Sequence, residues 1–376
     1  MEGIYLDNAA TTRLDERVLE KMLPFFCENF GNPSAGYRRA RLAESALDKA
    51  RARVAGLINA RPEEIYFTSC GSESDNLAIK GIAKKSDIKR IISSRIEHHA
   101  VLESLNALKR EGFDVELVSV SREGLVSLNE IREGLKKGAG LVSIMAANNE
   151  IGTIQPIEEI ASLAREFSVP FHSDAVQAIG SLRIDVKKMN IDSLSISAHK
   201  FHGPKGIGAL YVRNGMRFEA QIDGGSQERR KRAGTENVAG AVGLSYAMEL
   251  AYEELDKNNE KISKLRDFLL DSLLEIEGLE LNGGRENRLC NNINLLIRGA
   301  KSQTLLVLLD KMGLEASVGS ACTAGSLEAS HVLMALGRSE EEALSSLRLT
   351  LGKENTLDEI KKAASIIKEA IALVRG

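Results

Sequence analysis

The stretch SLSISAHKFHGPKGIGALYV, residues 193–212, decides the fold that we predict. Two alternating apolar runs, residues 193–198 and 208–213, have the pattern of strands. His199, Lys200 and a glycine-proline turn lie between them, and Lys200 therefore comes just after the end of a strand. Because α/β proteins bind ligands at the carboxyl edge of the sheet, we expect Lys200 at such an edge.

Further apolar runs alternate with amphipathic stretches along the first two thirds of the chain. The amphipathic stretches, such as residues 100–112 and 156–168, have the 3.6-residue period of helices. This alternation is typical of α/β domains with a mostly parallel sheet. Five more runs complete a predicted seven-stranded sheet: residues 64–69, 90–94, 115–120, 141–147 and 169–174.

The length of 376 residues allows more than one domain. After residue 236 the pattern becomes strongly helical, and we place the domain boundary within that region. We predict a large α/β domain over residues 15–251. Residues 1–14 and 252–376 are predicted to form a smaller α+β domain, with strands near residues 291–297 and 315–320.

Charge and composition exclude several classes of protein. Apolar residues make up 43% and charged residues 27% of the chain, as in globular proteins. A net charge of -3 gives no general attraction to nucleic acid or to an anionic membrane, and we predict neither as a partner. The start, MEGIYLDNAATT, has no basic stretch followed by an apolar run, which predicts a cytoplasmic protein.

Four cysteines are present, with no Cys-x-x-Cys pair and no histidine at metal-ligand spacing. We therefore predict neither a resident metal nor a disulfide framework. Cys27 lies in an apolar helical stretch, which predicts core packing, and Cys290 begins a strand, which predicts a structural role. Cys322 lies in SVGSACTAGS, residues 317–326, whose small residues pack no core and leave the backbone free.

Two residues at strand ends suggest a cofactor. Asp174 follows the strand of VPFHSDAVQ and precedes Lys200 by 26 residues, the spacing of one strand-helix-strand step. A single lysine in such a loop is usually solvated, and a single aspartate there is as often a helix cap. Pyridoxal phosphate needs both groups: a lysine for the Schiff base and an acid beside the pyridine nitrogen.

The stretch EIYFTSCGSESDNLAIKG, residues 64–81, indicates an anion site. A strand turns through Gly71 and Ser72 into a helix, whose free N–H groups favour a phosphate, although an ordinary capped helix has the same pattern. His98 in RIEHHAVLE follows another strand and is a candidate to stack on a planar cofactor or to move protons. His99 beside it is predicted to be structural.

Nine motifs together resemble those of the NifS/IscS-type cysteine desulfurases. The resemblance runs in order, without large gaps, from about residue 4 to about residue 355. It implies a pyridoxal-phosphate-dependent transferase fold of type I, of the class V aminotransferase group, and a homodimer with active sites at the subunit interface. The motifs are YLDNAATT, FGNPS, SESDNLAIKG, EHHAVLE, SIMAANNEIGTIQPI, HSDAVQAIG, SAHKFHGPKGIGALYVR, GTENVAG and VGSACTAGSLEASHVL.

The resemblance also implies a role for each matching residue. Arg348, whose planar guanidinium suits a carboxylate, binds the substrate with Asn149, while the alternative for Arg348 is a surface ion pair. The implied cofactor contacts are Lys200 as the Schiff-base lysine, Asp174 at the pyridine nitrogen, Gln177 at the ring hydroxyl, His98 on the ring, Gly71, Ser72, Ser197 and His199 at the phosphate, and Thr235 reaching the phosphate from the partner subunit.

The implied reaction converts L-cysteine to L-alanine. Lys200 removes the α-proton, and a thiolate on Cys322 takes the sulfur as a persulfide. His98 and the substrate's own groups are alternative proton acceptors for Cys322. The sulfur then serves iron-sulfur cluster assembly or other thio-cofactors through an acceptor such as an IscU/NifU-like scaffold protein, and a transferred cluster is the one metal species expected near Cys322.

Several positions depart from the usual motifs. Cys70 stands where the phosphate turn usually has glycine, and Ser72 replaces a threonine, but both are short and we expect the cofactor to bind. Arg230 and Lys231 replace small and apolar residues and complete a basic run, residues 229–232. This run is predicted to form a solvated or interface face rather than a nucleic-acid site.

Two other kinds of function stay open from the sequence. A selenocysteine lyase or cysteine sulfinate desulfinase would share the fold and depend less on an enzyme thiol. A non-catalytic scaffold protein would also share it, although the presence of Lys200, Asp174 and Cys322 together argues against that reading.

Overall fold

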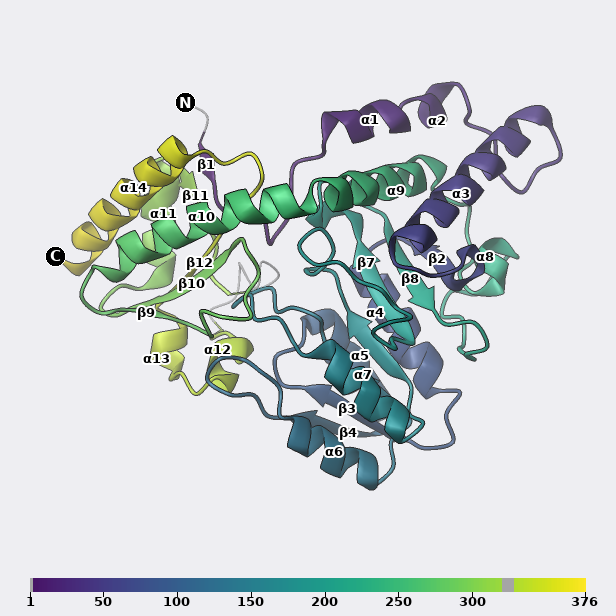
Figure 1. Cartoon of the computed structure of the whole chain (residues 1–376), viewed down its shortest axis with the longest axis horizontal. Coiled ribbons are helices and arrows are strands. Elements are labelled where there is room, and N and C mark those ends of the chain that lie inside the picture. Colours follow the sequence, from purple (N-terminus) through teal and green to yellow (C-terminus); the bar gives the residue numbers. More distant parts are fainter. Residues whose placement is uncertain (1–2, 320–327) are drawn as a thin grey trace.

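The computed structural model describes residues 3–319 and 328–376. A seven-stranded sheet in the order β2-β8-β7-β6-β5-β3-β4 forms its centre, as predicted (Figure 1). Neighbouring strands from β4 to β7 run parallel, and β8 is antiparallel to both of its neighbours. The strands are β2 (Ile65–Thr68), β3 (Arg90–Ser94), β4 (Asp114–Val118), β5 (Leu141–Ser143), β6 (Phe171–Asp174), β7 (Ser193–Ser197) and β8 (Gly208–Val212).

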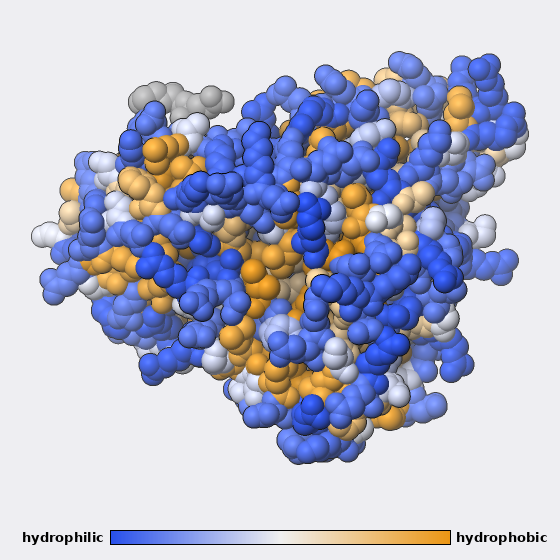
Figure 2. Space-filling view, in the orientation of Figure 1, coloured by the Kyte–Doolittle hydropathy of each residue, from blue (hydrophilic) through white to orange (hydrophobic). Residues whose placement is uncertain are grey.

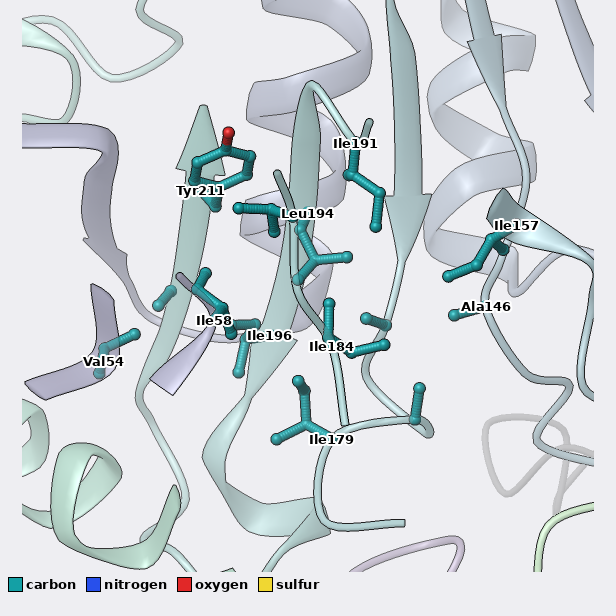
Figure 3. Packing of buried hydrophobic residues seen from close by; sticks show 14 of the residues in the cluster. Val54, Ile58, Ala146, Ile157, Ile179, Ile184, Ile191, Leu194, Ile196 and Tyr211 are labelled. Atoms are coloured by element: carbon teal, nitrogen blue, oxygen red, sulfur yellow. The ribbon is translucent and has the colours of Figure 1, made fainter. Parts of the chain in front are cut away.

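Helices pack on both faces of this sheet. Leu210 and Tyr211 are adjacent in β8 and belong to different buried clusters, because side chains alternate between the faces of a strand. Figure 3 shows the larger cluster, with Leu194 and Ile196 of β7 near Ile58. The helices of this part are α1 (Glu16–Met22), α2 (Pro24–Cys27), α3 (Arg38–Leu57), α4 (Gly71–Ala83), α5 (His99–Arg110), α6 (Leu128–Lys136), α7 (Ile157–Glu166), α8 (Gln227–Arg230) and α9 (Val238–Glu253), with the short 3₁₀ helices η1 (Pro62–Glu64) and η2 (Ala198–Lys200).

A separate hydrophobic cluster packs most of the remaining chain: it contains Leu6 and buried residues between Ile262 and Ile371. The first and last elements, β1 and α14, both lie on this side of the molecule (Figure 1). Helix α10 starts at Leu255, near the predicted boundary after residue 251, which stays a prediction. The elements are β1 (Ile4–Tyr5), β9 (Leu279–Leu281), β10 (Asn292–Ile297), β11 (Leu314–Glu315), β12 (Ser346–Thr350), α10 (Leu255–Leu274), α11 (Ser302–Lys311), α12 (His331–Ala335), α13 (Glu340–Ala343) and α14 (Leu357–Arg375).

The segment 7–12 connects these two cores. On one side Thr350 of β12 accepts hydrogen bonds from the backbone N–H groups of Asn8 and Ala9. On the other side the Thr12 backbone donates to the carbonyl of His199, 2.9 Å away. This segment therefore lies beside both η2 and β12, and it forms part of the site.

The structure corrects the prediction for Cys27. Its side chain is exposed at the last residue of α2, and neighbouring Phe26 is 57% exposed. The helix is a single turn that begins at Pro24 on the molecular surface, so the apolar sequence does not imply burial here. Cys290 is partly buried, its Sγ lies 3.2 Å from Asn259 Oδ1, and burial raises the pKa of its thiol to about 11.

The basic run, predicted to form a solvated or interface face, has two exposed residues, Arg229 and Arg230, and two partly buried ones, Lys231 and Arg232. The Arg229 guanidinium lies over the Tyr66 ring, 4.2 Å from its centre, and Lys231 Nζ donates to the Phe218 carbonyl at 2.7 Å. Arg232 forms an ion pair with Glu73 in the first turn of α4. Three of the four basic side chains are thus bound by the protein itself, because the turn folds back onto β2 and α4.

Arg230 has a backbone conformation that favours glycine, with φ of 63° at an exposed position. Such left-handed geometry costs an L-residue about 1–2 kcal/mol. We expect Arg230→Gly to raise the free energy of unfolding by about 1 kcal/mol, measured by urea denaturation. Arg230→Ala, which removes the side chain and keeps the Cβ, is the control and should give no such gain. An equal rise in the free energy of unfolding in both variants would mean that removal of the arginine side chain, and not relief of backbone strain, stabilises the protein.

Candidate active site

The site forms where four parallel strands end. Asp174 is the last residue of β6, and Lys200 follows β7 in η2. His98 follows β3 and caps α5, and Asn149 lies beyond β5. Because parallel strands share one carboxyl edge, these four residues from distant parts of the sequence come together.

A cleft with about 810 Å³ of empty space, part of it open to solvent, lies at this edge. Thr235 is exposed and does not line the cleft of its own chain, and Cys322 lies outside the described residues. All the other predicted site residues line the cleft: Gly71, Ser72, His98, Asn149, Asp174, Gln177, Ser197, His199, Lys200 and Arg348.

Lys200 is held by backbone carbonyls of the 7–12 segment. Its Nζ donates to the carbonyl oxygens of Ala9 and Ala10, at 2.5 Å and 2.8 Å. Gln177 Nε2 donates to the same Ala9 carbonyl at 2.9 Å. No role was predicted for Ala9 and Ala10. The signal was the motif YLDNAATT, in which two alanines let the backbone approach the lysine closely.

One end of the cleft has groups suited to a phosphate. Gly71 starts α4, and a Cβ added there would lie only 2.8 Å from Val176 Cγ2, so the chain needs glycine at this position. Ser197 Oγ is buried and has no hydrogen-bond partner among the described residues. Helix N–H groups and an unpaired buried hydroxyl make a site where a phosphate would be well bound. Cys70 precedes Gly71 and also lines the cleft.

Asp174 gives the cleft a buried acid. It is 6% exposed, its Oδ1 accepts a hydrogen bond from the Val176 backbone at 2.9 Å, and burial raises its pKa. Asp75 of α4, 1% exposed, lines the same cleft, and its pKa is raised by burial and by the negative charge of Asp174. The sequence analysis missed Asp75 because nothing within its helix distinguishes it. Two buried acids favour a cation beside them, and the protonated nitrogen of a pyridine ring is such a cation.

His98 is neutral at pH 7. Burial, and then the positive charge of Lys200, lowers its pKa to about 4. Its Nδ1 accepts a hydrogen bond from the Ala100 backbone at 3.1 Å, which leaves the proton of the neutral ring on Nε2. His99 packs against His331, with 4.8 Å between ring centres, in agreement with the structural role predicted for it.

Arg348 of β12 is 1% exposed, which rules out the surface ion pair considered as an alternative. Its Nη1 donates to the backbone carbonyl of Asn149 at 3.2 Å, and its Nη2 donates to Asp7 Oδ1 at 2.8 Å. Its buried Nε has no partner among the described residues. A guanidinium with an unused donor in a cleft is suited to bind a carboxylate.

Within residues 3–319 and 328–376, no group of three or more histidine, cysteine or acidic residues is arranged to hold a metal ion. Over those ranges, no helix has both the length and the apolar character needed to cross a membrane.

The fold and the lysine-bearing cleft agree with the class-V aminotransferases, whose family model matches residues 4–363. The chain belongs to this family and, within it, to the group of IscS- and NifS-type cysteine desulfurases.

Among similar proteins, cysteine desulfurase IscS of Methanosarcina thermophila is 48% identical, covering 100% of this chain and 93% of the relative. The putative cysteine desulfurase IscS 1 of Bacillus subtilis is 46% identical over 99% of each chain. A solved NifS-like protein superposes with a TM-score of 0.92 at 38% identity, covering 99% of this chain and 100% of that one. The cysteine desulfurase of Thermococcus onnurineus NA1 has a TM-score of 0.88 at 26% identity, with 98% and 95% covered.

Proposed function

We propose that this chain binds pyridoxal phosphate in the cleft at Lys200 and converts L-cysteine to L-alanine, passing the sulfur to Cys322. The observation that carries the proposal is the arrangement of Lys200, the buried acid Asp174 and the buried Arg348 around one cleft. A lysine, an acid and a carboxylate receptor are the groups that a pyridoxal enzyme acting on an amino acid requires.

The residues that line the cleft have the chemical groups that each part of pyridoxal phosphate needs. Ser197, Ser72, His199 and the start of α4 at Gly71 would hold the phosphate, and Thr235 of a second subunit would complete that site. Asp174 would pair with the pyridine nitrogen, Gln177 would reach the ring hydroxyl, and His98 would stack on the ring. When bound, pyridoxal phosphate supplies an aldehyde for the amino group and an electron-poor ring that stabilises negative charge at Cα.

The protein's own groups then handle the substrate. Arg348 and Asn149 bind the carboxylate of L-cysteine and fix the orientation of its Cα. Lys200, once released from the cofactor, removes the α-proton as a general base. His98, neutral and with its proton on Nε2, would donate that proton over the ring.

The sulfur step belongs to Cys322. Its thiolate attacks the sulfur of the substrate, and a sulfur–sulfur bond forms as the Cβ–S bond breaks. The electron pair of the broken bond stays with the substrate carbon, which takes up a proton to become the methyl group of alanine. The product on the enzyme is a persulfide, ready for transfer to an acceptor such as an iron-sulfur scaffold protein.

We infer that the protein acts as a homodimer. Helices α1 to α3 and the loop between α2 and α3 carry large apolar side chains in contact with solvent, among hydrophilic ones (Figure 2). Exposed apolar surface of this extent is typical of an interface. The most exposed members are Leu23 at 55%, Phe26 at 57%, Phe30 at 62% and Tyr37 at 55%.

Cys322→Ala tests the proposed function. The wild-type protein, supplied with pyridoxal phosphate and L-cysteine, should release alanine and carry one persulfide per subunit, detected by alkylation and mass spectrometry. In Cys322→Ala we expect no persulfide at this site and about a hundredfold slower alanine release, because the attacking thiolate is missing. Cys27→Ala removes an exposed thiol that does not line the cleft and is the matched control.

Other outcomes would support the competing functions. Alanine release from Cys322→Ala at the wild-type rate would contradict the persulfide mechanism and favour a selenocysteine lyase or a sulfinate desulfinase. Protein that stays colourless after addition of pyridoxal phosphate would indicate a non-catalytic scaffold.

A further inference from the structure

The buried guanidinium of Arg348 has a resident counter-ion. Arg348 Nη2 and Asp7 Oδ1 are 2.8 Å apart, and the side chains are 1% and 18% exposed. The other contact that holds this guanidinium is the uncharged carbonyl of Asn149. A buried arginine without an acid nearby would be strongly unfavourable, so the Asp7 carboxylate stabilises the Arg348 guanidinium inside the fold.

The backbone around Asp7 is anchored on several sides. Asp7 forms a parallel bridge with Thr350, two residues beyond Arg348. Its carbonyl accepts a hydrogen bond from the hydroxyl of Tyr5 at 3.0 Å, and Asn8 Nδ2 donates to the Thr350 carbonyl at 3.0 Å. The carboxylate is therefore presented to Arg348 from a fixed position.

Two contacts define the plane of the guanidinium. Asp7 holds Nη2 and Asn149 holds Nη1, and the Nε–H group has no partner among the described residues. Arg348 lines the cleft, whereas Asp7 does not. The acid thus holds the guanidinium from outside the space that a ligand would enter.

We propose that Asp7 is a positioning residue for the substrate: it fixes the Arg348 guanidinium so that Nε–H and the remaining Nη hydrogens receive the carboxylate of L-cysteine. The proposal rests on the proposed function, in which Arg348 binds that carboxylate. It gives the aspartate of YLDNAATT a role in substrate selection, because only ligands with a carboxylate make use of the aligned donors.

The experiment compares two ligands on the pyridoxal-phosphate-loaded enzyme: L-cysteine and cysteamine, which has the same amine and thiol but no carboxylate. Ligand binding is followed by the change in visible absorbance of the bound cofactor, and turnover by alanine release. In Asp7→Ala we expect the KM for L-cysteine to rise about tenfold with kcat within twofold of wild type. The dissociation constant of cysteamine should stay within twofold.

Asp7→Asn keeps an oxygen acceptor at the same distance and should restore the KM for L-cysteine to within threefold of wild type. Asp15→Ala is the matched control, because Asp15 lies near the same segment and pairs with Lys353 at 2.6 Å without lining the cleft. We expect wild-type values for both ligands in this control.

Three results would overturn the proposal. An unchanged KM for L-cysteine in Asp7→Ala would show that Arg348 needs no help in alignment. Equal weakening of L-cysteine and cysteamine, or loss of the cofactor absorbance in both Asp7 variants, would mean that Asp7 only maintains the fold of the segment. Failure of the proposed function is recognised separately, since wild-type protein would then release no alanine.

Discussion

Lys200→Ala should reduce alanine release about 10⁴-fold, because in the proposed function the same amine attaches the cofactor and removes the α-proton. Among the described residues of the cleft, His98 is a poor substitute base, because its pKa is lowered to about 4 and one of its ring nitrogens is committed to the Ala100 backbone. Measuring the rate of alanine release checks proton removal. Reduction with borohydride followed by denaturation checks cofactor attachment, since wild-type protein should keep the cofactor and the variant should lose it.

Lys205→Ala is the control for this variant, because Lys205 is an exposed lysine in the same turn. It should keep both the rate and the covalent cofactor. Cofactor retained by Lys200→Ala after reduction and denaturation would assign the Schiff base to another lysine.

Asp174→Asn should lower kcat about 10³-fold. The carboxylate is buried at the end of β6. At a buried site, loss of one group aligned to stabilise a developing charge lowers kcat by a factor of about 10²–10³. In the proposed function, the pyridine nitrogen is then no longer kept protonated, and the ring stabilises negative charge at Cα poorly. Alanine release at saturating L-cysteine measures the effect.

A cofactor analogue makes the test of Asp174 specific. N-methylated pyridoxal phosphate has a permanently cationic ring nitrogen. We expect this analogue to raise the kcat of Asp174→Asn at least tenfold. Asp192→Asn removes a carboxylate that pairs with Arg213 at 2.7 Å, before β7 begins at Ser193, and should keep the wild-type rate. No recovery with the analogue would contradict a role for Asp174 at the ring nitrogen.

Much of the large sheet was predictable because strands and helices are encoded by local periodicity. The seven predicted runs each coincide with a strand of the sheet, with differences of a few residues at the ends. The strand predicted over residues 315–320 is an exception, since β11 covers Leu314–Glu315 and Ser317 makes an isolated bridge to Arg348. Pairing with a distant partner, rather than alternation along the chain, decides such short strands.

The sequence by itself determined the order of the elements and the residues with chemistry at the strand ends, Asp174 and Lys200 among them. Periodicity and motif spacing are local properties and need no knowledge of packing. The tertiary structure alone decided which distant groups meet: the carbonyls of Ala9 and Ala10 at Lys200, some 190 positions away, and Asp7 at Arg348, 341 positions away. Those contacts arise because one N-terminal segment is bound between two hydrophobic cores, and no local pattern records which cores a segment will join.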